Sequence, residues 1–306
     1  MIASILATLV DSPSTAAAMC SAGLALLLIA ALAGRTEIAE AHGLDKIVAL
    51  RSLSVAVPLA VFGALHLAGP QFVSNLVPPY MPGRMFWVYA VGCFLIAASL
   101  SIATNIQVRW AGLLLGIMMF LFVAMIHFPG ALRTPDQRVI WMIVVREMSF
   151  GGAGWLLAAN AMPAGNEKLA TIVRVVGKTW ITLALVVFGI EHFLHPHLLP
   201  GVPLAKEMPL WIPAQALIDY VTGAALLAAA ASVLLRKKSR TVVTLTGAWL
   251  LLLIIVIYTP FMVISLLDPA IGVQLTGVNY FADTLLFAGA VLALAQVEKP
   301  DQRSPA

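Results

Sequence analysis

The ten residues VFGALHLAGP at 61–70 recur without a gap as VFGIEHFLHP at 187–196. A proline-rich string follows each copy, VPPYMP at 77–82 and MPLWIP at 208–213. Matches at this many ordered positions are improbable by chance, even in a sequence of biased composition. They predict that the chain contains two copies of one structural unit.

The register of the two copies changes once. The first string recurs after 126 residues and the second after 131, so the second copy holds five extra residues between positions 197 and 208. A Tyr-x-x-Gly pattern then begins the next apolar segment in both copies, at Tyr89 and at Tyr220. We therefore expect the insertion to lie in a loop.

The composition is typical of a membrane protein. Of the 306 residues, 61% are hydrophobic and only 10% are charged, and the mean hydropathy is +0.98. A soluble domain is roughly half apolar and about one quarter charged. The net charge of +4 comes from basic residues in short gaps between apolar runs, where membrane topology explains them. We therefore expect a lipid bilayer, and no nucleic acid, as the partner of this surface.

Apolar segments of membrane-spanning length follow one another along the chain. A helix needs about 20 apolar residues to cross the hydrocarbon core of a bilayer, and a helix that contains a proline, as at Pro58, still qualifies. We expect nine spans, at residues 16–34, 52–69, 85–104, 110–128, 141–161, 177–195, 214–235, 241–267 and 279–297. The first ten residues are apolar but too short to span, and we expect them at the membrane interface.

The duplication and the spans together predict an all-α integral membrane fold. Each copy holds four spans, an even number, so both copies share one orientation as a parallel repeat. We expect an N-terminal transmembrane helix and linker at 1–50, four-helix repeats at 51–163 and 164–298, and a short polar tail at 299–306.

Lysine and arginine residues are unequally divided between the two sides of the membrane. With the N-terminus outside, thirteen lie on the inner side, and five, Arg84, Arg133, Arg138, Arg146 and Lys206, lie on the outer side. Positive residues concentrate in the cytoplasmic loops of membrane proteins. The distribution predicts a plasma-membrane protein, in the inner membrane if bacterial, with the N-terminus outside and the C-terminus in the cytoplasm.

Titratable side chains within the spans gather in the outer third of the membrane. Such groups are costly in a bilayer, and each one is a candidate functional residue. The candidates for ligand binding are His66, His127, Glu147, Glu191, His192, Asp219 and Asp283. Because the inner two-thirds of the spans is almost free of charge, we expect a binding site to open toward the outer side.

Two pairs of these candidates are equivalent between the copies. His66 corresponds to His192, and the simplest interpretation of both is a neutral imidazole bonded to a carbonyl of the adjacent proline loop. Glu147 corresponds to Asp283, and both are expected in the first turn of a helix, where the helix dipole favours a carboxylate. Glu147 also has Arg146 beside it. Contact with a substrate, a quinone or a proton is the alternative for all four.

The second copy carries two acidic residues that the first copy lacks. Glu191 takes the place of Leu65, and Asp219 takes the place of Val88. If the second copy is active and the first has become structural, Glu191 and the adjacent histidine mark the place where activity is expected.

The sequence encodes no recognisable metal or redox centre. Cys20 and Cys93 are far apart and form no CxxC pair, which excludes a dithiol mechanism. His195 and His197 form an HxxHxH pattern with His192, yet His195 precedes a proline and is pushed toward extended geometry. A solvated loop explains these histidines better than a metal site does. We therefore expect no metal, and the cofactor stays open, with quinone as a candidate.

Two motifs of the repeat point to a known family. The pattern G-x-x-H-F with a following proline occurs at 189–196, and V-P-P-Y-x-P occurs at 77–82. With these motifs the repeat unit resembles the DoxX-like family of small four-span membrane proteins, over nearly all of residues 50–297. Each copy departs from the pattern, since Leu67 replaces the phenylalanine in the first copy and Trp211 replaces the tyrosine in the second. Such divergence fits specialisation of the two copies.

The resemblance implies two functions, and the duplication suggests a third. Some members are similar to subunits of quinone-linked sulfur oxidoreductases, which favours a quinone- or lipid-interacting subunit whose redox centre is held by a partner, because protein residues alone carry no one-electron chemistry. Others are similar to assembly factors, which favours a non-catalytic assembly factor or structural subunit. The duplication also suggests a small-solute transporter, although the charge-free inner half argues against it. We expect a membrane-protein partner or a homo-oligomer, and whether the chain is an enzyme stays open.

Overall fold

The computed structural model describes residues 14–298, and this part of the chain is all-helical, with no strand. Nine of its helical segments are long and apolar enough to cross a membrane, which agrees with the number of expected spans and suggests a multi-pass membrane protein. The expected interfacial segment and polar tail, at 1–10 and 299–306, lie outside the described residues.

Several of the nine segments are longer than expected, and two of them start well before the expected residue. Helix α11 begins at Glu167 rather than near 177, and α15 begins at Ile271 rather than near 279. Their first turns carry polar residues, so hydropathy alone placed the starts too late. The spans are α2 (Thr15–Ala33), α4 with α5 (Asp45–Val48 and Arg51–Ala68), α7 (Arg84–Thr104), α8 with η1 and α9 (Val108–Phe122, Val123–His127 and Phe128–Arg133), α10 (Arg138–Asn160), α11 (Glu167–Leu194), α12 (Gln215–Leu235), α13 with η2 and α14 (Ser239–Leu253, Ile254–Tyr258 and Thr259–Leu266), and α15 (Ile271–Val297).

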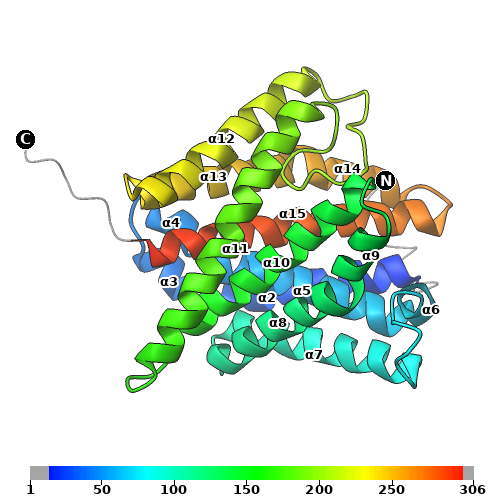
Figure 1. The fold of residues 1–306 in the computed structure, drawn as a ribbon, viewed down its shortest axis with the longest axis horizontal. Coiled ribbons are helices and arrows are strands. Elements are labelled where there is room, and N and C mark those ends of the chain that lie inside the picture. The colour runs from blue at the N-terminus through cyan, green and yellow to red at the C-terminus, as the bar shows by residue number, and fades with distance from the viewer. Residues whose placement is uncertain (1–13, 299–306) are drawn as a thin grey trace, which may run out of the picture.

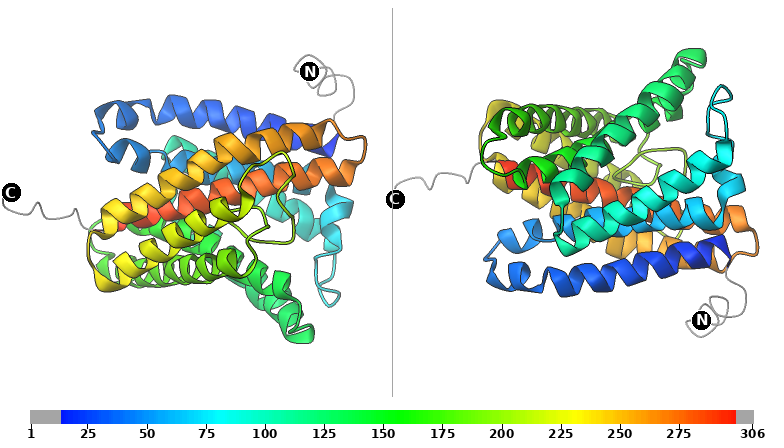
Figure 2. Two further views of the ribbon diagram at one scale, coloured as in Figure 1. Left: turned by 90° about the horizontal axis from the view of Figure 1, so that it is seen from above. Right: turned by 90° about the horizontal axis from the view of Figure 1, so that it is seen from below.

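The long helices pack as a ring (Figures 1 and 2). Consecutive segments pack against each other from α5 to α15, and α15 returns to pack against α5. Helices α10 and α15 also pack against each other across the ring, and α2 lies against the outside of α5. The contact of α15 with α5 brings the last long helix of the described residues beside the second.

Close contacts between helix backbones depend on glycine. The Cβ of a side chain at Gly112 in α8 would lie 2.3 Å from the carbonyl oxygen of Gly154 in α10. A side chain at Gly289 in α15 would lie 2.9 Å from the backbone of Ser54 in α5. Small residues at such crossings allow the van der Waals packing that joins helices in membranes.

Two π-helical turns interrupt long helices at one end of the ring. The turn η1 ends at His127 and η2 ends at Tyr258, and each is followed by a short α-helix whose second residue is proline, Pro129 or Pro260. Proline lacks an N–H, and its ring clashes with the carbonyl four residues earlier. A widened turn before the proline relieves that clash and is often found at functional sites.

Both proline loops lie at this same end, beside α9 and α14, which we name the proline-loop end (Figure 1). In the loop at 69–83, which includes the short helix α6 (Pro70–Ser74), most residues are at least partly exposed. In the loop at 195–214, all seven residues of 198–204 are buried. The longer loop therefore runs into the protein, whereas the shorter one lies over its surface.

Candidate functional site

The buried segment 198–204 covers a histidine and an aspartate. His192 of α11 and Asp219 of α12 are both 0% exposed. The N–H of Gly201 donates to Nε2 of His192 at 3.0 Å, so this nitrogen carries no proton. The proton of a neutral ring then lies on Nδ1, 2.9 Å from Oδ1 of Asp219. The sequence suggested a bond from His192 to a loop carbonyl, and the loop group is instead an N–H.

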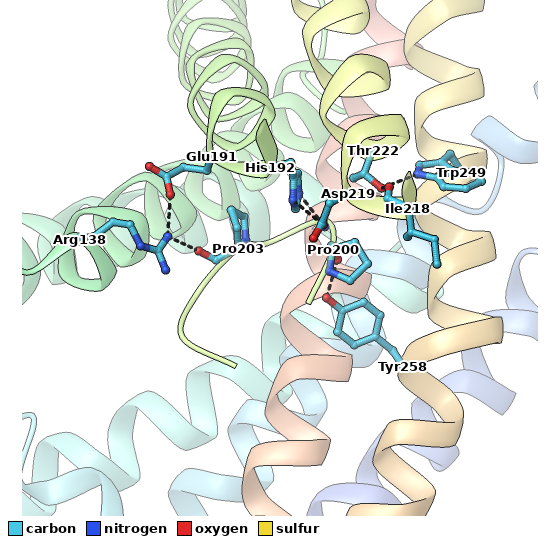
Figure 3. Close-up of polar contacts among 11 residues, drawn as sticks. Arg138, Glu191, His192, Pro200, Pro203, Ile218, Asp219, Thr222, Trp249 and Tyr258 are labelled. Carbon is cyan, nitrogen blue, oxygen red and sulfur yellow. Dashed lines mark hydrogen bonds and ion pairs between the residues drawn. The ribbon is translucent and has the colours of Figure 1, made fainter. Parts of the chain in front are cut away.

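Asp219 has few polar partners for a carboxylate at this depth. Neither of its oxygens makes a hydrogen bond within the described part of the chain, and the contact with His192 is within ion-pair distance but poorly aligned. Thr222, one turn later, donates to the carbonyl of Ile218 and accepts from Trp249 instead (Figure 3). A buried polar group without a bond is unusual and needs an explanation.

Two tyrosines hold the same loop from the other side. The hydroxyl of Tyr258, at the end of η2, donates to the carbonyl oxygen of Pro200 at 2.5 Å (Figure 3). The hydroxyl of Tyr280 in α15 accepts from the backbone N–H groups of Ala205 and Lys206, at 3.2 and 3.0 Å. The loop backbone is therefore bonded to α11, η2 and α15.

Glu191 lies next to His192 but takes part in a different contact. Its carboxylate is 2.7 Å from Nη1 of Arg138, the first residue of α10. Arg138 also donates to the carbonyl of Pro203 (Figure 3). A further bond joins it to the carbonyl of Leu204. Glu191 therefore fixes an arginine that binds the loop.

A second cluster of charges joins α10 to α15. Nη2 of Arg146 lies 2.5 Å from Oε1 of Glu147, and Nη1 lies 2.7 Å from Oδ2 of Asp283. The pairing of Glu147 with Arg146 considered from the sequence is present. The expectation that Glu147 and Asp283 lie in first helix turns is wrong, since α10 begins at Arg138 and α15 begins at Ile271, more than two turns earlier. Their partner is therefore the guanidinium and not the helix dipole.

His66 and His127 lie beside this charge cluster, and both are half-buried. Nδ1 of His66 donates to the carbonyl of Phe62 at 2.7 Å, which leaves Nε2 without a hydrogen-bond partner among the described residues. His127 makes no hydrogen bond or ion pair within residues 14–298. Glu147 is close enough to act electrostatically on both rings. These are the two histidines of the site with ring nitrogens open to a ligand.

The structure thus divides the seven candidates into three groups. His192 and Asp219 meet under the loop, and Glu191 meets Arg138. Glu147 and Asp283 bind Arg146, and His66 and His127 lie within electrostatic reach of Glu147. The residues missed from the sequence are Tyr258, Tyr280 and Gly201, as well as the role of Arg138. Tyr258 could have been singled out from the sequence, because it follows the candidate His127 by 131 positions, the offset of the second sequence match.

The extra histidines of the loop do not form a metal centre. Nε2 of His195 lies 3.7 Å from Oε2 of Glu191, and the rings of His195 and His197 are 6.3 Å apart. Across residues 14–298 no group of three histidine, cysteine or acidic side chains has a geometry that could hold a metal ion.

Comparisons of the chain with known protein families, with curated proteins and with solved structures found no match.

Proposed function

We propose that the chain is a duplicated, DoxX-like integral membrane protein. Its element lengths support the duplication: α7 and α12 both have 21 residues, and α8 and α13 both have 15. The π turns that follow, η1 and η2, both have five. All these elements recur after 131 residues, the register of the second sequence match.

Unusual backbone conformations support the same proposal. Between α7 and α8, Asn105 and Gln107 have φ values of 58° and 57°. Arg236 and Lys238, 131 residues later, have φ values of 55° and 49°. Non-glycine residues uncommonly adopt left-handed φ, and asparagine does so more often than glutamine, arginine or lysine. A shared inherited turn explains why four such residues adopt it in matched pairs.

The two equivalent histidines also have equivalent surroundings. A Cβ at Gly92 would lie 2.9 Å from the Cβ of His66, and a Cβ at Gly223 would lie 3.1 Å from that of His192. The glycine of each Tyr-x-x-Gly pattern thus makes room for the histidine of its own copy. These contacts support the transfer of the family motif to both positions.

We further propose that the charge cluster at the proline-loop end belongs to a quinone site. The observation that carries this proposal is the pairing of two half-exposed histidines, His66 and His127, with a cluster in which one cation, Arg146, serves two carboxylates. A quinone that is reduced to quinol takes up two electrons and two protons, and the reverse reaction releases them. His66, His127 and Glu147 can exchange those protons, while the electrons pass to a redox centre in a partner subunit.

The location of the cluster suits an amphiphilic ligand. We propose that the nine apolar segments span a plasma membrane with the proline-loop end outside, as the lysine and arginine distribution predicts. The histidines would then lie near the level of the lipid head groups. An apolar tail could remain among lipid chains while the polar ring reaches the histidines.

Quinone binding to the purified protein in lipid nanodiscs tests the proposal. We expect decylubiquinone or decylubiquinol to bind the unmodified protein and His66→Ala or His127→Ala to weaken binding about tenfold, the equivalent of one hydrogen bond. His42→Ala is the matched control, because His42 is exposed and lies between α3 (Arg35–Glu40) and α4. These two short helices lie at the end opposite the proline loops (Figure 1). Unchanged affinity in both site variants would contradict the proposed site.

A structural or assembly role is the second candidate. It is favoured by polar side chains that bond within the protein, which are those of Tyr258, Tyr280, Glu191 and, from the first half, Arg138. Under this role, a partner membrane protein co-purifies with the chain, and His66→Ala leaves its amount unchanged.

A further inference from the structure

The loop segment 198–204 makes hydrogen bonds with polar side chains of the second half from within the protein. It donates an N–H to His192 and accepts a bond from Tyr258 through the carbonyl of Pro200. The same segment buries Leu199 and Val202, which are 0% and 1% exposed. The segment therefore supplies a hydrogen-bond donor to His192 and an acceptor to Tyr258, and it adds apolar surface beside them.

In the first half, the corresponding positions face no such segment. His66 and His127 correspond to His192 and Tyr258, and both are half-buried. The loop at 69–83 is five residues shorter than the loop at 195–214, and no hydrogen bond from it to either histidine occurs within residues 14–298. The shorter loop therefore leaves the hydrogen-bonding positions of His66 and His127 free for a ligand.

We infer that the segment 198–204 is a built-in occupant of the second of two equivalent ligand positions, so that the protein binds a single quinol, at His66 and His127. This inference rests on the proposed function and states which half binds and which redox form is preferred. It also explains the insertion: five extra residues give the second loop the length to turn inward.

The preference for quinol follows from the hydrogen-bond direction. Nε2 of His192 accepts from the N–H of Gly201. A carbonyl can only accept, so Nδ1 of His66 carries the proton and donates to the carbonyl of Phe62. Nε2 of the neutral ring then carries a lone pair that can accept a hydrogen bond. The phenolic O–H of a quinol can donate to that lone pair, whereas a quinone carbonyl cannot.

The two rings do not have the same orientation, and one substitution explains the difference. In the second half the proton on Nδ1 faces Asp219. In the first half Val88 stands at the position of Asp219, so Nδ1 of His66 turns to its own helix. The nitrogen left to accept a bond is Nε2 in both cases.

The test is the number of sites for decylubiquinol on the full chain in nanodiscs, measured by titration. We expect one site, about tenfold weaker for decylubiquinone, lost in His66→Ala and kept in His192→Ala. In a variant whose residues 195–214 are replaced by residues 69–83, we expect two sites. Two sites in the unmodified protein, or binding lost in His192→Ala and kept in His66→Ala, would overturn the inference.

If the loop variant does not fold, hydrogen exchange on the unmodified protein can still show which half binds decylubiquinol. Bound decylubiquinol should slow amide exchange near His66 and His127 and leave exchange of residues 198–206 unchanged. Altered exchange at 198–206 would show that ligand displaces the loop, against the inference. Equal or tighter binding of decylubiquinone would overturn the donor argument. Absence of binding by both forms would reject the proposed quinone site itself, a result distinct from binding at the wrong half.

Discussion

Nη1 of Arg146 lies 2.7 Å from Oδ2 of Asp283, a residue 137 positions later in the chain. This contact connects α10 to α15 across the middle of the helix ring, and the same guanidinium holds Glu147. Both carboxylates are buried, so the arginine is the cation that makes their burial tolerable.

Replacing Arg146 with alanine should therefore destabilise the protein strongly. Removing one partner of a buried ion pair typically costs about 3–5 kcal/mol, because the remaining charge is left uncompensated. Thermal unfolding in detergent should show a large drop in Tm. Arg84→Ala is the matched control, since Arg84 is exposed and should change little. Equal effects of the two variants would show that the cluster adds no stability.

Packing between α8 and α10 gives a second prediction. A Cβ at Gly112 would lie 2.3 Å from the carbonyl oxygen of Gly154, and backbone atoms cannot give way as a flexible side chain can. Gly112→Ala should destabilise by about 1–3 kcal/mol through overpacking. Gly272→Ala, with nothing within 4 Å of its Cβ, is the control in the same unfolding measurement. A variant at Gly112 as stable as the parent would mean that the two helices can separate at little cost.

The hydroxyl of Tyr258 provides a third prediction. Tyr258→Phe removes the bond to the carbonyl of Pro200 and should cost about 1 kcal/mol. We expect faster amide exchange in residues 198–206, measured by mass spectrometry, because the loop loses one attachment. Tyr220→Phe is the control, since the Tyr220 ring is 41% exposed and stacks on Phe193. Protection that is the same in both variants would contradict the role of the hydroxyl.

The orientation in the membrane can be tested by labelling. In a variant without the two native cysteines, a membrane-impermeant maleimide added to intact cells should label Lys206→Cys, at the proline-loop end. It should label Lys237→Cys, in the basic turn between α12 and α13, only after lysis. Labelling of Lys237→Cys in intact cells would invert the proposed topology and place the histidine site on the cytoplasmic side.

Hydropathy and the repeat predicted the number and order of the long helices, because span length and composition are local properties of the sequence. The helix starts at Glu167 and Ile271 could not be found in this way, since polar first turns look like loop. That error had a consequence: Asp283 was placed beside a helix terminus instead of opposite Arg146. Contacts over 137 residues depend on how helices pack, which periodicity does not specify.

The candidate residues were found more readily than their partners. Composition and position identified His192 and Asp219, and the structure places them 2.9 Å apart. Nothing in the sequence showed that residues 198–204 are buried, because leucine, proline and valine in a loop suit a surface cap equally well. The contact of Arg138 could not be predicted either, because its partner Glu191 lies on another helix.

The inward course of residues 198–204 also constrains the order of biogenesis. This segment is synthesised before α13, η2 and α15, yet Tyr258 and Tyr280 hold it in place. It can therefore reach its final position only after α15 has folded against it. A nascent chain halted before α15 should leave the segment open to protease, which would make its protection a late marker of completed assembly.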